Sequence, residues 1–327
     1  MTDPENTKPV GVTYGKLVLV QFMWGGTFVA SEIALRDLPP LTTAAVRFVL
    51  TTLAYLLMMR PRLHTLVKLG GNSVLYLALM GLFGVFAYTV LLNYGLILAS
   101  AADAALLIPT TQPVFTMFLA SIVLRRRPSA HLVAALCIGL IGATMVISGQ
   151  NAFGSAPEAL LGDLLLLAAS LSFSCYMVAG KLAAAEFDST TMTTVSTIVG
   201  TLLLLPTPFL LETQHWYRGI FTWQTAGAIF YLVVFATVIP YIWWNESVRR
   251  LGPVTTGLFT LLLPPIALLL AAVLLGQDVS STQLLGGAFA LTAVAMAMGL
   301  HTTILARVRV GQSQTNECRD RRGSRAP

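Results

Sequence analysis

Long apolar runs separated by short polar segments recur along the whole chain. A run of about 20 apolar residues is long enough to cross the ~30 Å hydrocarbon core of a membrane as one helix. The pattern predicts ten such helices and leaves no room between them for a soluble domain. The predicted spans are 14–35, 40–59, 74–97, 100–124, 131–149, 159–181, 190–211, 225–247, 254–276 and 283–304. The sequence therefore predicts an all-α membrane protein.

The amino-acid composition also indicates a lipid environment. Of the 327 residues, 56% are hydrophobic and 10% are charged, and the mean hydropathy is +0.76. A soluble domain carries about 25% charged residues, so this chain is expected to have the lipid bilayer as its partner. Residues 1–13 are predicted to be a cytoplasmic segment, and the basic residues 305–327 a disordered cytoplasmic tail.

Lysine and arginine are distributed unequally over the predicted loops. Of the 20 basic residues, only Arg36 and Arg218 fall on one side of the membrane and Arg47 falls within a span. Basic loops stay in the cytoplasm, so the bias predicts a cell-membrane protein with both termini cytoplasmic. The net charge of +6 is then a topological signal, and nucleic acid is not an expected partner.

The spans divide into two halves of five, residues 14–149 and 150–304. Because five is odd, two similar halves would lie in opposite orientations. One ungapped register, offset by 152 residues, pairs Asn93 with Asn245 and Pro113 with Pro265. Inverted repeats with interrupted helices are typical of secondary transporters, whose solute sites lie at the repeat interface near the bilayer midplane.

Prolines stand inside the fourth and ninth predicted spans. Pro109 and Pro113 interrupt the fourth span, and Pro264 and Pro265 interrupt the ninth. A proline inside a helix costs about 3 kcal/mol and is tolerated in a membrane where other groups satisfy the freed backbone. Two interpretations stay open: a static kink that improves packing, or a bend used in gating, with Pro113 and Pro265 as the candidate residues.

Four segments carry a family resemblance: WGGTFVASEIALRDLPPLTTAAVRF (24–48), LNYGLILASAADAALLIPTTQPVF (92–115), GDLLLLAASLSFSCYMVAGKL (162–182) and NESVRRLGPVTTGLFTLLLPPIALLLAAVLLG (245–276). They resemble the drug/metabolite transporter superfamily, EamA type. The resemblance implies two EamA-like repeats, alternating access and the transport of small metabolites, often amino acids. The family often ends its fourth and ninth helices in Gly-Glu. Here Leu124-Arg125 and Gly276-Gln277 stand instead, so a gating role for such glutamates does not carry over.

Ionisable residues within the spans are the first candidates for chemistry, because they are expensive in lipid. Arg47 is expected roughly 10 Å below the outer surface, and Asp103 and Asp163 enter their spans from the same side. Two interpretations stay open. Arg47 pairs structurally with an aspartate, or it anchors a substrate carboxylate while an aspartate gates or carries a proton.

Polar and aromatic residues within the spans are the second group of candidates. Asn93 and Asn245 either bond to unwound backbone or bind solute. Glu246 and Arg250 are expected to form an interfacial salt bridge, and Trp244 to belong to the interfacial aromatic belt. The candidate cavity residues are Trp24, Arg47, Tyr88, Asn93, Phe115, Tyr176, Tyr241 and Asn245. The aromatic residues among them either wall a solute pocket or only pack.

Other patterns narrow the function class. Small residues at 139–143 and 286–290 predict close helix packing, with a homodimer contact as an open alternative. Three cysteines without close spacing predict neither a disulfide nor a metal site, and no cofactor is expected. No Walker A loop or H-E-x-x-H motif is present, which argues against an enzyme. The favoured function is a secondary transporter that exports an amino acid or related metabolite. The alternatives are a channel and a non-transporting membrane scaffold.

Overall fold

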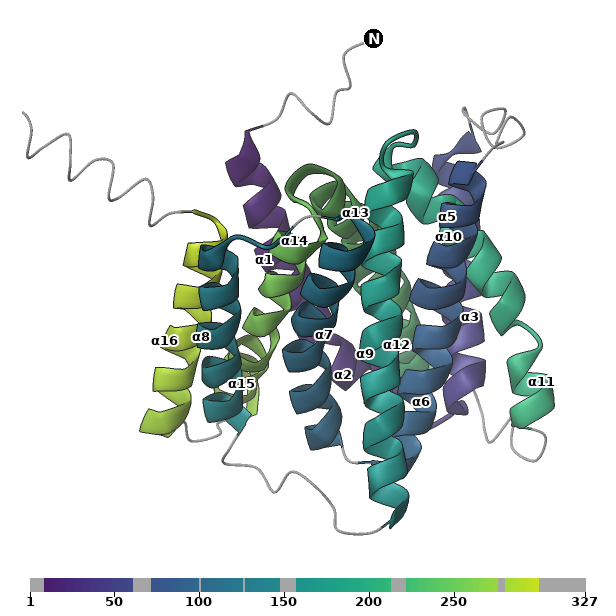
Figure 1. Ribbon diagram of the computed structural model, residues 1–327. Coiled ribbons are helices and arrows are strands. Elements are labelled where there is room, and N and C mark those ends of the chain that lie inside the picture. The colour runs from purple at the N-terminus through teal and green to yellow at the C-terminus, as the bar shows by residue number, and fades with distance from the viewer. Residues whose placement is uncertain are drawn as a thin grey trace, which may run out of the picture.

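The computed structural model describes residues 9–60, 72–99, 101–125, 127–147, 157–212, 222–275 and 280–299. Every element in these ranges is helical (Figure 1). Eight helical segments are long and apolar enough to cross a membrane, and two shorter apolar helices, Ala130–Val146 and Ser281–Ala297, complete the set. The predicted ten-helix membrane fold is confirmed, with span boundaries shifted by a few residues. The predicted tail 305–327 lies outside the described residues.

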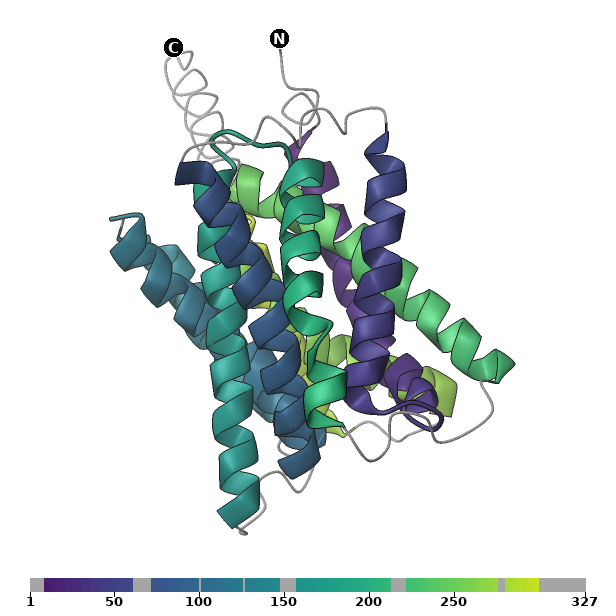
Figure 2. The same ribbon diagram turned by 90° about the vertical axis from the view of Figure 1, so that its right-hand side faces the viewer.

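The first five crossings contain α1 Val10–Gly25, α2 Thr27–Ala34, α3 Pro40–Met58, α5 Asn72–Met80, η2 Gly81–Ala87, α6 Tyr88–Leu98, α7 Ala101–Val123 and α8 Ala130–Ile147. The next five contain α9 Pro157–Ala183, α10 Ser189–Leu204, α11 Thr207–Leu211, α12 Trp223–Val233, η3 Val234–Val238, α13 Ile239–Leu251, α14 Pro253–Leu258, η4 Phe259–Leu262, α15 Leu263–Leu275 and α16 Ser281–Ala297. Figures 1 and 2 show them as one bundle. We call the end where α1 begins and α13 ends the N-terminal side, and the opposite end the far side.

The offset of 152 residues holds in the structure. The fourth crossing runs from Ala101 to Val123 and the ninth from Pro253 to Leu275, which are the same positions in the repeat. The third and eighth crossings each contain a π-helical segment, η2 and η3, and the offset superposes these segments as well. The two five-helix halves are therefore similar along their length and inverted.

The proline-containing helices differ between the halves. α7 is one continuous helix in spite of Pro109 and Pro113. In the second half the chain passes through a 3₁₀ turn, η4, directly before Pro264 and Pro265. The Thr260 hydroxyl of η4 is shared between the carbonyl of Gly257 at 2.7 Å and that of Pro109 at 3.3 Å. Pro109 O is the acceptor that Pro113 leaves free, so one half satisfies the other's backbone.

The small residues in the fifth and tenth crossings pack against each other. α8 and α16 lie side by side at the edge of the bundle (Figure 1). A Cβ added at Gly142 would lie 2.6 Å from the carbonyl oxygen of Gly286, and one at Gly286 would lie 2.6 Å from that of Gly142. These glycines therefore serve close packing within the chain, as predicted, and are not free for a homodimer contact. A homodimer stays a prediction without a surface assigned to it.

Buried charges join α1 to α13 on the N-terminal side. Glu246 accepts a hydrogen bond from Lys16, and its other oxygen lies 3.8 Å from Arg250 Nη1. Arg250 Nη1 also donates to the Thr13 hydroxyl at 2.5 Å. The expected Glu246–Arg250 pair is present, but its side chains are only 6% and 8% exposed. The pair is therefore buried within the protein, where it closes a helix interface.

Candidate functional site

Arg47 binds the π-helical segment η3 in the middle of the bundle. Its Nε donates to the Thr237 hydroxyl at 2.6 Å and its Nη2 to the Ala236 carbonyl at 3.2 Å. A π-helical turn bonds i to i+5 and is often found at functional sites. Its irregular hydrogen bonding leaves carbonyl groups open to side-chain donors. Arg47 itself is half-buried.

Two further side chains bind the same turn. Trp24 Nε1 donates to the Ala236 carbonyl at 3.2 Å. The Tyr55 hydroxyl lies 3.2 Å from the Thr237 carbonyl and 3.1 Å from that of Val238. Tyr55 and Thr237 were missed by the sequence analysis. The one available signal was that Tyr55 follows Arg47 by eight residues, which puts both on one face of α3.

The structure does not bring Arg47 to the aspartates. Among the described residues, its polar partners are Thr237 and Ala236, and its guanidinium carbon lies 5.4 Å from the Phe48 ring centre. Asp103 on α7 and Asp163 on α9 are 1% and 9% exposed, and they interact electrostatically with each other. The structural ion pair expected for Arg47 is therefore not formed with either carboxylate.

An aromatic cluster adjoins this turn, with Phe173 of α9 at its centre. The Phe173 ring centre lies 6.1 Å from that of Trp24, 5.1 Å from those of Tyr88 and Tyr176, and 6.4 Å from that of Tyr241. Four predicted cavity residues therefore meet around a residue that the sequence analysis missed. A phenylalanine among many apolar residues carries no sequence signal for such a role.

The aromatic side chains of this cluster differ in how much of their surface is exposed. Trp24 and Tyr88 are half-buried, whereas Tyr176 and Trp244 are completely buried. The Trp24 and Trp244 ring centres are 4.9 Å apart, so Trp244 belongs to the packed interior. The expectation that Trp244 lies in the interfacial belt is wrong. The exposed surface of the cluster therefore lies on Trp24 and Tyr88.

The two asparagines of the repeat have different surroundings. Asn245 is completely buried, and its Nδ2 donates to the Tyr176 hydroxyl at 2.7 Å and the Thr193 hydroxyl at 2.8 Å. Asn93 is half-buried and donates to the Thr89 carbonyl of its own helix at 2.8 Å. Only Asn245 is joined to the aromatic cluster.

The repeat is visible in the cluster itself. The offset of 152 residues places Trp24 on Tyr176 and Ala236 on Gly84. Trp24 bonds to Ala236 in η3, and the Tyr176 ring lies so close to Gly84 in η2 that a Cβ there would be 2.3 Å from it. Each half thus sets one aromatic side chain against the π-helical segment of the other half.

The remaining candidates lie outside the cluster. Phe115 is half-buried on α7, where Pro113 is buried, and Pro265 is half-buried on α15. Asp163 Oδ1 is buried without a hydrogen-bond partner.

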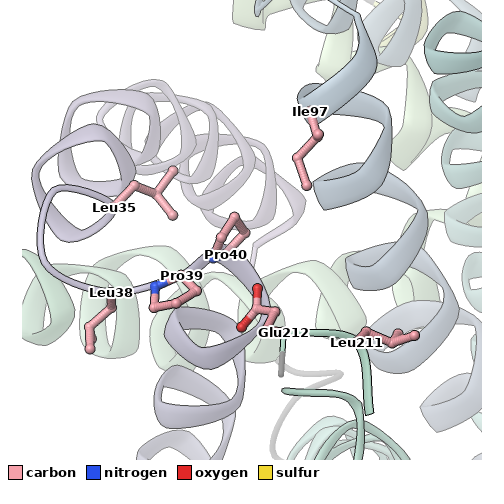
Figure 3. A pocket seen from close by; sticks show the side chains of 7 residues that line it. All are labelled: Leu35, Leu38, Pro39, Pro40, Ile97, Leu211 and Glu212. Carbon is pink, nitrogen blue, oxygen red and sulfur yellow. The ribbon is translucent and has the colours of Figure 1, made fainter. Parts of the chain in front are cut away.

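A pocket of about 350 Å³ opens on the far side (Figure 3). Its lining consists of Leu35, Leu38, Pro39, Pro40, Ile97, Leu211 and Glu212. Figure 3 shows the Glu212 carboxylate pointing toward the start of α3, where it accepts from the amides of Leu41 at 2.6 Å and Thr42 at 2.9 Å. This carboxylate caps a helix, and no predicted site residue lines the pocket.

A second far-side carboxylate also joins the halves. Asp37 accepts from the Thr225 hydroxyl, and from the hydroxyl and amide of Thr222 at 2.9 and 3.3 Å. The hydrogen bonds from Thr225 and Thr222 lower the pKa of Asp37 below its ordinary value. These contacts fasten the segment between α2 and α3 to the start of α12.

Known proteins match both halves of the chain. The EamA-like transporter family matches residues 12–148 and again 160–299. A Salmonella typhimurium protein named as a probable amino-acid metabolite efflux pump is 28% identical over 82% of this chain and 89% of its own length. A Streptantibioticus cattleyicolor protein named as a probable terminal-alkyne amino-acid exporter is 29% identical over 85% and 90%. A solved crystal structure, 20% identical, has a TM-score of 0.73 over 90% of this chain and 99% of its own, which shows a shared fold.

Proposed function

Because the chain belongs to the EamA-like transporter family, we propose that it exports an amino acid or a related small metabolite across the cell membrane by alternating access. Two relatives named for amino-acid efflux or export support the substrate class and the direction. The basic residues of the predicted loops support an orientation with both termini in the cytoplasm. A transporter family is not an enzyme class, and the multi-pass helical fold agrees with this assignment.

The observation that carries the substrate class is the environment of Arg47. The residue lies deep in its helix, is half-buried, and among the described residues has only neutral polar partners, Thr237 and Ala236. A charged residue within a membrane bundle faces a partner or a pathway. A guanidinium recognises a carboxylate by charge-assisted hydrogen bonds. We assign Arg47 to the carboxylate of the solute.

The aromatic cluster is assigned to the rest of the solute. Trp24 and Tyr88 are half-buried beside Phe173 and Tyr241, and aromatic faces provide large rigid walls for an apolar group. Tyr176 and Asn245 close the cluster on the N-terminal side. Movement of these groups would open the site toward that side. Of the two proline candidates, Pro265 lies in the crossing that would bend, whereas Pro113 lies in the continuous helix α7.

Counterflow in proteoliposomes of the purified protein tests this function. We expect saturable exchange with a preference for solutes that carry a carboxylate. Arg47→Ala should raise KM for such solutes about tenfold or more, because a hydrogen bond to a charged group contributes about 1.5–3 kcal/mol. Arg36→Ala, on an arginine that is 69% exposed, is the matched control and should leave KM unchanged.

The outcomes separate the alternatives. Unchanged transport by a folded Arg47→Ala protein would remove Arg47 from the site while leaving the carrier intact. Solute flux that does not saturate would favour a channel, and no flux with any solute would favour a membrane scaffold.

We further propose that Asp103 and Asp163 couple transport to protons. Both carboxylates are buried and interact with each other, and Asp163 Oδ1 lacks a hydrogen-bond partner. Two neighbouring carboxylates can share one proton, because each negative charge disfavours the other. Asp163→Asn should make transport insensitive to an imposed pH gradient while exchange at equal pH continues. A variant that still responds to the gradient would contradict this coupling.

A further inference from the structure

Gln21 of α1 is a polar side chain without a partner in the interior. It is completely buried, and both Nε2 and Oε1 of its amide lack hydrogen-bond partners. The indole Nε1 of Trp244 is also buried without a partner. Few buried polar groups in folded proteins stay unsatisfied, because each one destabilises the fold. The retention of a full carboxamide in this state calls for a role beyond packing.

Gln21 lies one helical turn from a member of the aromatic cluster along α1. It precedes Trp24 by three residues, about one helical turn, and the Trp24 ring packs on that of Trp244. The repeat offset of 152 residues places Gln21 on Phe173, the centre of the cluster. Gln21 is therefore the counterpart, in the first half, of the residue at the centre of the aromatic cluster.

The same two helices close the N-terminal side. α1 carries Gln21 and also Lys16 and Thr13, while α13 carries Trp244 and also Glu246 and Arg250. The Lys16–Glu246 and Thr13–Arg250 contacts hold these helices together. Along α1, Gln21 stands between these contacts and the aromatic cluster, five residues after Lys16 and three before Trp24.

We propose that the Gln21 carboxamide and the Trp244 indole N–H are solute-binding groups that select the neutral polar part of the solute. The amide supplies N–H donors and a carbonyl acceptor, and the indole supplies one donor, which fits an uncharged hydroxyl or amide group of the solute. They act when α1 and α13 separate. This inference rests on the proposed function, and it assigns specificity beyond the carboxylate held by Arg47.

Gln21→Leu tests the inference, because leucine keeps most of the volume and removes both unsatisfied atoms. We expect the melting temperature to rise by about 2 °C or more, while KM for the transported solute rises about tenfold. Gln112→Leu is the matched control. Its amide is buried on α7 of the same half, and its Nε2 contacts Met177 Sδ at 3.5 Å. This variant should show no rise in the melting temperature and no tenfold increase in KM.

Trp244→Phe provides a second variant, which removes the indole N–H and keeps an aromatic ring. It should raise KM in the same direction as Gln21→Leu. A Gln21→Leu protein that is less stable than the wild type, or that is folded and keeps the wild-type KM, overturns the inference. If the wild type exchanges no solute, the proposed function fails and the inference with it. Wild-type exchange with an unaffected Gln21→Leu variant leaves the proposed function standing.

Discussion

The two proline-containing crossings occupy the same positions in the repeat and have different structures. α7 stays continuous, whereas the ninth crossing narrows into the 3₁₀ turn η4 between α14 and α15. In α7, hydroxyls surround the prolines. The Thr111 hydroxyl contacts Ser170 of α9 at 2.8 Å, and the Ser174 hydroxyl lies 3.0 Å from the Gln112 carbonyl. These hydrogen bonds anchor the proline-containing part of α7 to α9.

The ninth crossing lacks such support around its prolines. Residues 261–273 contain no hydroxyl side chain, and two adjacent prolines remove two successive amide donors. The chain tightens to a 3₁₀ turn, and Phe259 of this turn stacks on Tyr14 of α1, with ring centres 5.9 Å apart. A proline alone therefore does not interrupt a membrane helix. Its neighbouring donors and acceptors decide whether the helix continues, and the second half is the one prepared to bend.

The largest effect is expected from restoring the missing amides in the second half. Pro264→Ala with Pro265→Ala should extend α15 through η4 and slow transport about tenfold or more, because access would then require breaking a regular helix. Pro113→Ala should alter the transport rate by less than about threefold, since α7 is already continuous. Counterflow rates measure both. An equal loss in the two variants would break the distinction between the halves.

A smaller effect is expected from the hydroxyl that joins the two proline regions. Thr260→Val keeps the shape and removes the group shared between the carbonyls of Pro109 and Gly257. The variant should lose about 1–2 kcal/mol of stability, the cost of leaving a buried acceptor unsatisfied. Thermal unfolding in detergent measures the loss. Thr292→Val serves as the control, because Thr292 is exposed and bonds only within its own helix. Equal stability of both variants would contradict the role of Thr260.

The smallest effect is expected at Asp37, which lies outside both proline-containing helices. Because hydrogen bonds lower the pKa of Asp37 in the folded protein, its charge stabilises the fold above about pH 4, the ordinary carboxyl range. That contribution is lost as the pH falls through the folded pKa. Asp37→Asn should slightly lower the melting temperature at pH 7, and the difference from the wild type should shrink in acid. A difference that grows in acid would show the opposite sign of linkage.

The ten crossings and the repeat could be predicted from the sequence, because span length and the spacing of Asn93, Asn245, Pro113 and Pro265 are visible in it. The aromatic candidates Trp24, Tyr88, Tyr176 and Tyr241 meet in one cluster, and whether they line a solute pocket stays a prediction. These features depend on single residue types in fixed positions, which a sequence displays directly.

Other features of the site depend on backbone geometry or on choices between apolar residues. The segments GLFGVFA and VFATV form the two π-helical turns, yet neither contains a residue that demands such a turn. Phe173 is one aromatic residue in an apolar helix, and Tyr55 is one donor whose acceptors are carbonyls created by η3. Arg47 could be recognised from the sequence as an unusual charge within a span. Its partners Thr237 and Ala236 could not, because the sequence does not reveal the π-helical segment η3.

The shared π-helical segments also bear on the history of the chain. A π-helical turn accommodates one residue more than an α-helical turn of the same length. η2 and η3 lie in the same register, and the ungapped pairing of Asn93 with Asn245 continues beyond them. Had one half acquired its extra residue alone, the register would shift there. The register does not shift, which is the result expected if the extra residue was present before the two halves were duplicated.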